Sequence, residues 1–395
     1  MKEIKTDVLI VGGGLTGLLT ACALSSLELR ILLIDSNIIF SDLNNKDFRT
    51  TAIAEGSKLF FEELGIWTGI YKHSEKIKTI KVFDRNISRK INFSNSKNLG
   101  NLGYVVKNTK IKSELIKLLK LKKNIKILQN TPLEKIKKNQ ENVTVFSGNN
   151  KIVSKLLISA DGKNSFIREI FGTPAFKKKY NHSAFVTNFS HKKNLNNIAY
   201  EIFLKSGPLA LLPMKSLNNN TYNSSLIWSN PSNFSKNLLK TNLALRKKIL
   251  EEKIFNYTGE IINFFDTKVF HLSAHINTKF YDKRLVYVGD SAHSLHPIAG
   301  QGWNLGVRDV KNLLKIIIHA KKNGLDLGTE FVCKNYHNLS HHHAYSLYQV
   351  TDKLNSIFLD ESVKANFIRK SGFFFINKTK KIKNQITKYA MGVYF

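Results

Sequence analysis

The chain has few cysteines and no long apolar segment. Its 395 residues include only two cysteines, Cys22 and Cys333, so neither a disulfide framework nor a cysteine metal cluster is supported. No apolar stretch approaches the roughly 20 residues that a membrane-spanning helix needs. The opening residues MKEIKTD contain no apolar signal region. We therefore expect a protein of a reducing, cytoplasmic compartment that does not cross a membrane.

Acidic residues are also scarce: 29 Asp and Glu stand against 61 Lys and Arg, giving a formal net charge of +32. A nucleic-acid partner, an anionic membrane surface and a lysine-rich composition would each explain this charge. The charged fraction of 23% is ordinary, and lysines are scattered through every segment, which favours compositional bias, with membrane attraction next. No RRM-type, zinc-finger or bZIP pattern accompanies the charge, so we expect no nucleic-acid partner.

The N-terminal segment has the pattern of a β-α-β unit. DVLIVGGG predicts a buried strand and a glycine turn, LTGLLTACALSS predicts a helix, and RILLIDS predicts a second strand. Gly12, Gly14 and Gly17 have the G-x-G-x-x-G spacing, and Asp35 ends the second strand, where a carboxylate can hold ribose hydroxyls. The glycines permit a tight turn and close approach of a pyrophosphate to the helix N-terminus. This unit predicts dinucleotide binding.

Two later segments place an acid and a glycine after a buried strand. LLISA leads to Asp161 and Gly162, and RLVYV leads to Gly289 and Asp290. Ligands of α/β sheets bind at the carboxyl ends of strands, although Asp161 would also fit an ordinary helix N-cap. Arg49, in DFRTTAIAEGS, would pair with a cofactor phosphate, line a cofactor pocket or be a solvated surface arginine.

The segment after Asp290 has the residues of a ligand-binding loop. Pro297, Gly300 and Gly302 predict a loop whose backbone can approach a flat ligand closely. A helix is expected from about Asn304, and its first N–H groups would point at that ligand. Such a helix end suits a ring that becomes anionic.

Several histidines invite a functional interpretation. His293 and His296 would act in catalysis or have a structural role, and the structural role is favoured beside such a loop. The run His341 to His343 is typical of a metal tract, but without acidic partners we expect no metal site there. No Ser-His-Asp or paired-carboxylate constellation is found, so no catalytic side chain is predicted.

Four blocks, in order along the chain, resemble group A flavoprotein monooxygenases, the aromatic hydroxylases with the para-hydroxybenzoate hydroxylase fold. They are GGGLTG with Asp35, FRTTAI, SADGKNS and GDSAHSLHPIAGQGWNLGVRD. Within them HPIAGQGWNLGVRD, together with LGYVVKN and YAMG, is most similar to the ubiquinone-biosynthesis hydroxylase branch. The resemblance is weakest between residues 176 and 275. Asp35 stands where the family more commonly has glutamate.

The resemblance implies an α/β fold with a Rossmann-like FAD-binding domain, an inserted antiparallel β-sheet substrate domain and a C-terminal helical segment. The FAD-binding domain would be discontinuous, comprising residues 1–75, 101–175 and 276–325. Residues 76–100 and 176–275 would form the substrate domain. Residues 326–395 would form the C-terminal helical region.

The resemblance also implies roles for individual residues. It assigns Asp290 to the ribityl chain of FAD and the backbone amides of Asn304 and Leu305 to the pyrimidine carbonyl of the flavin. Arg49 would lie near the cofactor, Asp161 would support FAD or the approach of the nicotinamide, and Pro297 would line the isoalloxazine site. The residues expected to bind the cofactor are Gly12, Gly14, Gly17, Asp35, Arg49, Asp161, Gly162, Gly289, Asp290, Pro297, Gly300, Gly302, Asn304 and Leu305.

The implied activity is hydroxylation of the aromatic ring of a polyprenylated phenol in ubiquinone biosynthesis. In this family NAD(P)H reduces FAD, O2 adds to the flavin C4a atom, and the resulting hydroperoxide transfers one oxygen to the ring. A flavin hydroxylase of another aromatic compound or a flavin-dependent isoprenoid reductase is the alternative. A halogenase is disfavoured because its W-x-W-x-I-P signature is missing. A lysine-rich binding protein, from a different class, would need no flavin.

A polyprenylated substrate lies in the membrane, which would give the basic charge and the aromatic C-terminus a function. Basic residues would meet anionic headgroups while aromatic side chains enter the interface. Packing of a C-terminal helix on the FAD domain is the alternative. Besides substrate and O2, the expected partners are therefore an anionic membrane, contacted peripherally, and other proteins of the quinone pathway. The aromatic residues concerned are Phe373, Phe374, Phe375, Tyr389, Tyr394 and Phe395.

Overall fold

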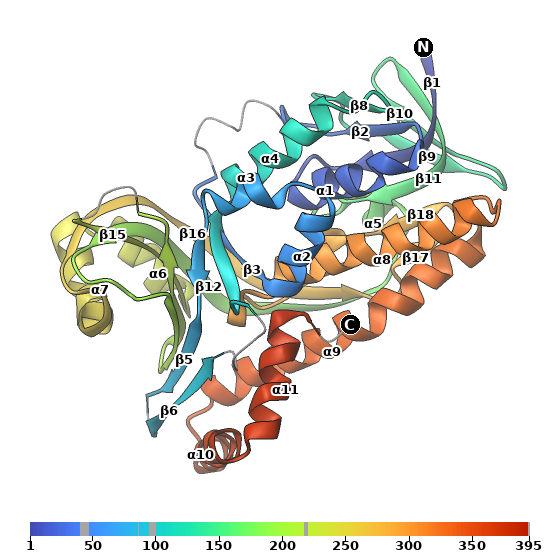
Figure 1. The fold of residues 1–395 in the computed structure, drawn as a ribbon. Helices are drawn as coiled ribbons and strands as arrows, with labels where there is room; N and C mark the ends of the chain where they lie inside the picture. The colour runs from blue at the N-terminus through green and yellow to red at the C-terminus, as the bar shows by residue number, and fades with distance from the viewer. Residues whose placement is uncertain (40–46, 86, 95–99, 217–219, 394–395) are drawn as a thin grey trace.

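A computed structural model describes residues 1–39, 47–85, 87–94, 100–216 and 220–393. Its strands form three sheets, and helices pack on and between them (Figure 1). The fold confirms the expected α/β architecture with C-terminal helices. The helical segment predicted from about residue 304 begins at Gly302.

The first sheet has a parallel centre in the order β18-β11-β1-β2-β8. The second parts of β1 and β11, together with β2, are buried apolar runs, as expected where helices cover both faces. Short antiparallel strands extend this sheet. The strands are β1 (Lys2–Val11), β2 (Ile31–Ile34), β8 (Ile125–Leu128), β9 (Lys135–Lys138), β10 (Val143–Ser147), β11 (Asn150–Ser159), β17 (Tyr281–Asp282) and β18 (Leu285–Tyr287).

Helices from both halves of the chain pack on this sheet. The helix after β1 contacts one helix from residues 108–120 and another from residues 302–322, so segments distant in sequence share one core. These helices are α1 (Leu15–Leu24), α4 (Asn108–Lys120), α5 (Phe166–Ile170), α8 (Gly302–Lys322) and α9 (Glu330–Leu359).

The second sheet has eight strands in the order β19-β16-β12-β15-β14-β13-β5-β6. All neighbours are antiparallel except β13 and β5, which run parallel because a segment from the first quarter of the chain joins the edge of the later strands. The strands are β5 (Thr79–Asp84), β6 (Ile87–Ser94), β12 (Ala175–His191), β13 (Ile198–Leu204), β14 (Gly207–Met214), β15 (Tyr222–Pro231), β16 (Ile261–Asn277) and β19 (His293–Ser294).

Two helices, α6 (Ser232–Lys240) and α7 (Leu243–Thr258), cover one face of this second sheet. Their Leu238, Leu250 and Ile254 are buried against sheet residues such as Phe185 and Trp228. The long strands β12 and β16 pair over almost their whole length and run from this sheet toward the first one (Figure 1). The opposite face of the second sheet is therefore directed toward the rest of the molecule.

A third, three-stranded sheet contains the segment that follows Arg49. The strands are β3 (Thr50–Ala54), β4 (Glu75–Ile77) and β7 (Gly103–Lys107), in the order β3-β7-β4. Along the chain, α2 (Glu55–Glu63) and α3 (Trp67–Tyr71) connect β3 to β4. Arg49 thus directly precedes a strand, which its pairing with β7 holds in place.

The C-terminal helices α10 (Val363–Lys378) and α11 (Lys380–Met391) pack against β6 of the second sheet. Gly392, directly after α11, lies against Gly56 of α2. Arg369 of α10 forms an ion pair with Asp84 of β5 at 3.2 Å, and both side chains are buried. At the end of α11, Met391 is buried with Ile77 and Met214. None of the helices within the described ranges is long and apolar enough to span a bilayer.

Candidate active site

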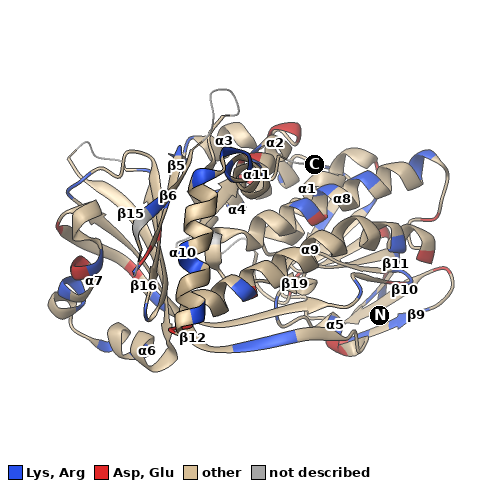
Figure 2. Ribbon diagram, turned by 90° about the horizontal axis from the view of Figure 1, so that it is seen from below, with Lys and Arg blue, Asp and Glu red and all other residues tan. Residues whose placement is uncertain are grey.

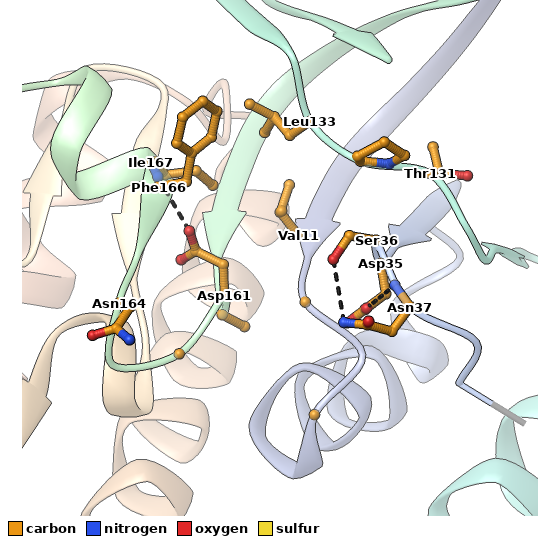
Figure 3. A pocket seen from close by; sticks show the side chains of 15 residues that line it. Val11, Asp35, Ser36, Asn37, Thr131, Leu133, Asp161, Asn164, Phe166 and Ile167 are labelled. Carbon is orange, nitrogen blue, oxygen red and sulfur yellow. Dashed lines mark hydrogen bonds between the residues drawn. The ribbon is translucent and has the colours of Figure 1, made fainter. Parts of the chain in front are cut away.

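A cleft of about 550 Å³ lies at the carboxyl ends of β1, β2 and β11. Five of the predicted cofactor residues line it: Gly12, Gly14, Asp35, Asp161 and Gly162. Figure 3 shows Asp35 and Asp161 on either side of the end of β1. The strand ends therefore bring together residues that are up to 150 positions apart in sequence.

The glycine positions fit the roles that their spacing predicts. Gly12 has φ +115°, and a Cβ there would lie 2.2 Å from the Ala160 carbonyl oxygen of β11. A Cβ on Gly17 would lie 1.8 Å from the Gly12 oxygen, so α1 packs directly on the turn. Gly14, by contrast, has open space in front of it and borders the cleft. The turn thus leaves its backbone accessible where α1 begins.

The two cleft carboxylates also hold local structure. Asp35 Oδ2 accepts a hydrogen bond from the Gly13 amide at 2.5 Å, and its Oδ1 accepts one from the Asn37 amide at 2.7 Å. Asp161 accepts hydrogen bonds from the Ser159 hydroxyl at 2.6 Å and the Ile167 amide at 3.1 Å (Figure 3). The capping interpretation of Asp161 is therefore partly correct, although the N-cap itself is Ser165.

Sequence reasoning missed part of this cleft. The end of β8 lies beside β2 in the parallel sheet and brings a further segment to the same edge. The signal was available, because the ends of parallel strands meet at one edge, but this segment carries no motif. The lining residues that were not predicted are Val11, Ser36, Asn37, Thr131, Pro132, Leu133, Ala160, Asn164, Phe166 and Ile167.

The second acidic segment lies against the start of α1. A Cβ on Gly289, whose φ is +60°, would lie 2.8 Å from the Thr16 side chain. Asp290 follows at the end of β18; its side chain is accessible, yet surrounding protein displaces enough water to raise its pKa. The charges of Lys163 and Arg49 oppose that rise. This combination of access and desolvation is typical of the wall of a concave site.

His293 and His296 both have structural surroundings. The His293 Nε2 atom lies 2.6 Å from Asp309 Oδ2, each side chain is 1% exposed, and the same oxygen accepts the Gly289 amide at 3.0 Å. Burial lowers the pKa of His296 to about 4, and its ring packs edge-on against Tyr180. The His293–Asp309 contact, which sequence reasoning missed, therefore fixes the position of the Gly289 turn.

Arg49 is not paired with a group of the cleft. Its guanidinium makes two hydrogen bonds to the Asp47 carboxylate, at 2.7 and 2.8 Å, and lies 5.7 Å from the centre of the Phe270 ring. The pair lowers the pKa of Asp47 against the opposing effect of burial. The cofactor role of Arg49 stays a prediction. As for a metal, the described part of the chain contains no group of three potential ligands.

The N-terminus of α8 is fastened to the third sheet through the Asn304 side chain. Its Oδ1 accepts the Ala54 amide at 2.8 Å and the Ser57 hydroxyl at 2.9 Å, while its Nδ2 donates to the Ala52 carbonyl at 2.8 Å. Sequence reasoning assigned a role to the backbone of Asn304 and missed these contacts. The Leu305 amide donates to the Gln301 carbonyl within the helix at 3.0 Å, so in this arrangement it is already engaged.

The loop before α8 meets the open face of the second sheet. Pro297 and Ile298 border a recess of about 10 Å³ whose other walls come from β13, β14 and β15. Glu201 of β13 and Ser229 of β15 are the polar residues in it. Burial raises the pKa of Glu201 to about 8. No sequence motif marked this recess, whose sheet residues are Glu201, Pro208, Ala210, Ile227 and Ser229.

The residues present fit FAD. The cleft offers an open glycine turn at a helix N-terminus and a carboxylate at the end of β2, which together suit a pyrophosphate and a ribose. The Gly289 turn and the start of α8 continue from it, joined through Thr16 and Gly306. The Pro297 loop then lies between these cofactor segments and the second sheet.

Known proteins of similar sequence include hydroxylases named for ubiquinone or its precursors. The chain is 28% identical over 388 residues to ubiquinone hydroxylase UbiL of Rhodospirillum rubrum, covering 98% of this chain and 89% of the relative. It is 24% identical to the 3-demethoxyubiquinol 3-hydroxylase of Escherichia coli over the whole of both chains. The fold is similar to that of p-nitrophenol 4-monooxygenase PnpA from Pseudomonas putida, with a TM-score of 0.78, 16% identity and 99% coverage of each chain.

A family model, described as an FAD binding domain, matches residues 5–344. That range includes every residue predicted above to bind the cofactor. The chain therefore belongs to the FAD binding domain family and is an FAD-dependent monooxygenase, of a class that uses NAD(P)H as co-substrate.

Proposed function

We propose that this protein hydroxylates the aromatic ring of a polyprenylated phenol in ubiquinone biosynthesis. The observation that carries the proposal is the position of the Pro297 loop, between the cofactor segments and a mostly apolar recess of the second sheet. The printed names of the relatives from Rhodospirillum rubrum and Escherichia coli support the pathway. An apolar wall suits a prenylated ring, and it also excludes water from the reacting atoms.

In this proposal the chain binds FAD along one continuous path. The Gly12 turn and Asp35 hold the adenosine diphosphate part, Asp290 binds the ribityl chain, and the Asn304 amide at the start of α8 faces the flavin ring. FAD, when bound, supplies the redox chemistry that brings one oxygen atom from O2 to the substrate ring. The positive end of the α8 dipole favours negative charge on the ring next to it.

We also propose the division of the chain that the sequence suggested. Residues 1–75, 101–175 and 276–325 would bind FAD, while residues 76–100 and 176–275 would bind substrate. The three-sheet topology supports this division, since β5 and β6 join strands from residues 175–277 in one sheet. Residues 326–395 would then form the helical region, which packs against both parts.

The C-terminal helices supply a surface for peripheral membrane contact, which we propose as the route to a prenylated substrate. On α10, Phe367 is 70% exposed and Phe375 is 60% exposed, whereas Phe373 is buried. Figure 2 shows Lys and Arg positions along α10 and α11. Basic and aromatic residues together favour an anionic interface. Tyr394 and Phe395, expected to take part, lie outside the described residues.

A vesicle flotation assay tests this surface without removing the helices. Phe367→Ser/Phe375→Ser protein is expected to float less than the parent with vesicles containing an anionic phospholipid, while Phe255→Ser, an exposed phenylalanine on α7, serves as the control. Equal flotation of the double variant and the parent would refute the membrane surface.

The pathway assignment is tested by mass spectrometry of quinone lipids from cells with and without the gene. We expect cells without it to accumulate a polyprenylated phenol that lacks one ring oxygen, which would also identify the ring carbon. An unchanged quinone profile would indicate that the substrate is another aromatic compound. Consumption of NAD(P)H without oxygen incorporation would instead indicate an isoprenoid reductase.

A further inference from the structure

We propose that Glu201 is a catalytic residue that accepts the proton of the substrate's phenol hydroxyl. This inference rests on the proposed function and adds a residue that takes part in the reaction. It starts from an acidic side chain in a recess whose other walls are mostly apolar.

The alternation of β13 directs Glu201 toward the cofactor side. Tyr200, Ile202 and Leu204 pack in the cluster that includes α6 and α7. Ala199 and Phe203 belong to two clusters on the other face of the sheet. Since side chains alternate along a strand, Glu201 shares the face of Ala199 and Phe203, and there it lines the recess with Pro297 and Ile298.

Few polar groups surround the Glu201 carboxyl. Its cross-strand neighbours are Ala210 on β14 and Val82 on β5, and the recess adds only the Ser229 hydroxyl as a polar group. No described residue forms a hydrogen bond or ion pair with the Glu201 side chain. Glu201 is half-buried, and a carboxyl in such a recess without a protein partner leaves its oxygens available to a ligand that supplies the partner.

The charged groups on the surrounding elements leave the carboxyl isolated. Asp84, further along β5, is neutralised by Arg369 of α10 at 3.2 Å. In the loop, His296 has its pKa lowered to about 4 by burial and is neutral near pH 7. The pKa of Glu201, about 8, is raised by loss of water alone. No neighbouring charge therefore competes with a ligand hydroxyl.

The proposed step is a balanced proton transfer. The phenol O–H bond breaks, the proton moves to a Glu201 carboxylate oxygen, and the electron pair stays on the phenolate oxygen, so no oxidant or reductant is required. A phenol ionises near pH 10, whereas an ordinary glutamate does so near 4.3. Because the pKa of Glu201 is raised to about 8, the proton affinities of acceptor and donor are closer together. The transfer takes place in the fraction of the protein in which Glu201 is ionised, and that fraction grows as the pH rises. The phenolate ring is more electron-rich and therefore more readily hydroxylated.

The size of the recess agrees with a small polar group. A volume of about 10 Å³ is close to what one water molecule occupies. A phenol hydroxyl would fill this space, while its ring would lie against the Pro297 loop. The loop must shift to admit the ring, because the recess itself is too small for it.

The test compares Glu201→Gln with the parent and with Glu252→Gln, an exposed glutamate on α7, all purified with flavin. The probe is 2-farnesylphenol in detergent. NADPH-driven hydroxylation measured from pH 6 to 9 gives kcat and KM at each pH. In the parent and in Glu252→Gln, we expect kcat to rise with pH as the Glu201 carboxyl ionises. In Glu201→Gln we expect this rise to vanish and kcat to fall about 100-fold, with KM changed only a few-fold.

Each outcome decides the proposal. If Glu201→Gln keeps the kcat and the pH profile of the parent, Glu201 is not the acceptor, and the proposed function stands. If the parent neither binds nor hydroxylates the probe, the proposed function fails, and the Glu201 proposal with it. If Glu201→Gln folds poorly, Glu201→Asp replaces it: an intermediate kcat that still rises with pH supports the proposal, and a parent-like kcat and pH profile overturn it.

Discussion

The cleft at the strand ends of the first sheet and the recess on the second sheet are formed by different parts of the chain. The cleft is made by backbone at strand ends: a glycine turn, the ends of β1, β2 and β11, and the start of α1. The recess is made by side chains on the face of a sheet, closed by one loop. Backbone sites require glycine at fixed positions and so leave a pattern in the sequence, whereas a sheet face accepts many side chains. The cleft is therefore easily recognised in the sequence, whereas the recess is not.

The largest effect is expected at the glycine turn. Gly12→Ala would force alanine into φ +115° and place its Cβ 2.2 Å from the Ala160 oxygen, so β1 and β11 must move apart. We expect a loss of about 3 kcal/mol or more in the free energy of unfolding. Flavin absorbance per protein should also disappear. Thermal unfolding and absorbance spectra measure both.

The control for that variant is Gly372→Ala on α10, where a Cβ meets no atom within 4 Å. It should change stability by no more than about 1 kcal/mol, in the stabilising direction. A Gly12→Ala protein that melts like the parent and keeps its flavin would contradict the account of the turn.

The next effect concerns Asp309 of α8, which holds the segment from Gly289 to His293. Asp309→Ala removes the partner of both His293 and the Gly289 amide. Because these groups would remain buried and unpaired, we expect a loss of about 3 kcal/mol in unfolding free energy, accompanied by lower flavin content. Asp282→Ala, which removes an exposed pair with Lys138, should cost less than about 1 kcal/mol. Equal melting temperatures for the two variants would argue against a structural role of the His293 contact.

A substitution in the recess should affect substrate turnover without affecting flavin content. Ala210→Leu adds volume to a wall of the recess and should abolish or strongly reduce turnover of a prenylated phenol. Flavin content should stay at the parent level, because the cleft is untouched. Overpacking is expected to cost about 1 to 3 kcal/mol in unfolding free energy. A variant that loses flavin but retains substrate turnover per bound flavin would reverse the assignment of the two regions.

The smallest effect concerns pH and the loop between the regions. The pKa of His296 is lowered from 6.5 to about 4, so between these values the unfolded state binds a proton that the folded state does not. His296 thus contributes stability above pH 6.5 that is lost as the pH falls toward 4, by up to about 1.4 kcal/mol per pH unit. His296→Phe should flatten that decline in urea unfolding measured from pH 7 to 5. The exposed His342→Asn should leave it unchanged; an unaltered slope in His296→Phe would contradict the assignment.

The glycine spacing, Asp35 and the four blocks were sufficient to predict the fold class and five of the residues that meet in the cleft. These features follow from local backbone geometry, which a short pattern can encode. The side-chain contacts of Asn304 and Asp309 could not be predicted in this way, because each depends on a partner brought close by the whole fold.

Glu201 shows the same limit more clearly. In the sequence it is one acid in a short alternating segment, IAYEIFL. Its importance depends on which face of β13 is covered by α6 and α7, and on the Pro297 loop arriving from nearly 100 residues later. The alternation of side chains determines which residues share a face of the strand, but it does not determine which segments pack against that face.

The most direct test of the central claim is incubation of the purified flavoprotein with NADPH, 2-farnesylphenol and isotopically labelled O2, followed by mass spectrometry of the product. The account predicts a hydroxylated ring that carries one labelled oxygen atom, formed only when all three reactants are present. A product without the label, or NADPH oxidation that leaves the phenol unchanged while a double bond is reduced, would contradict it.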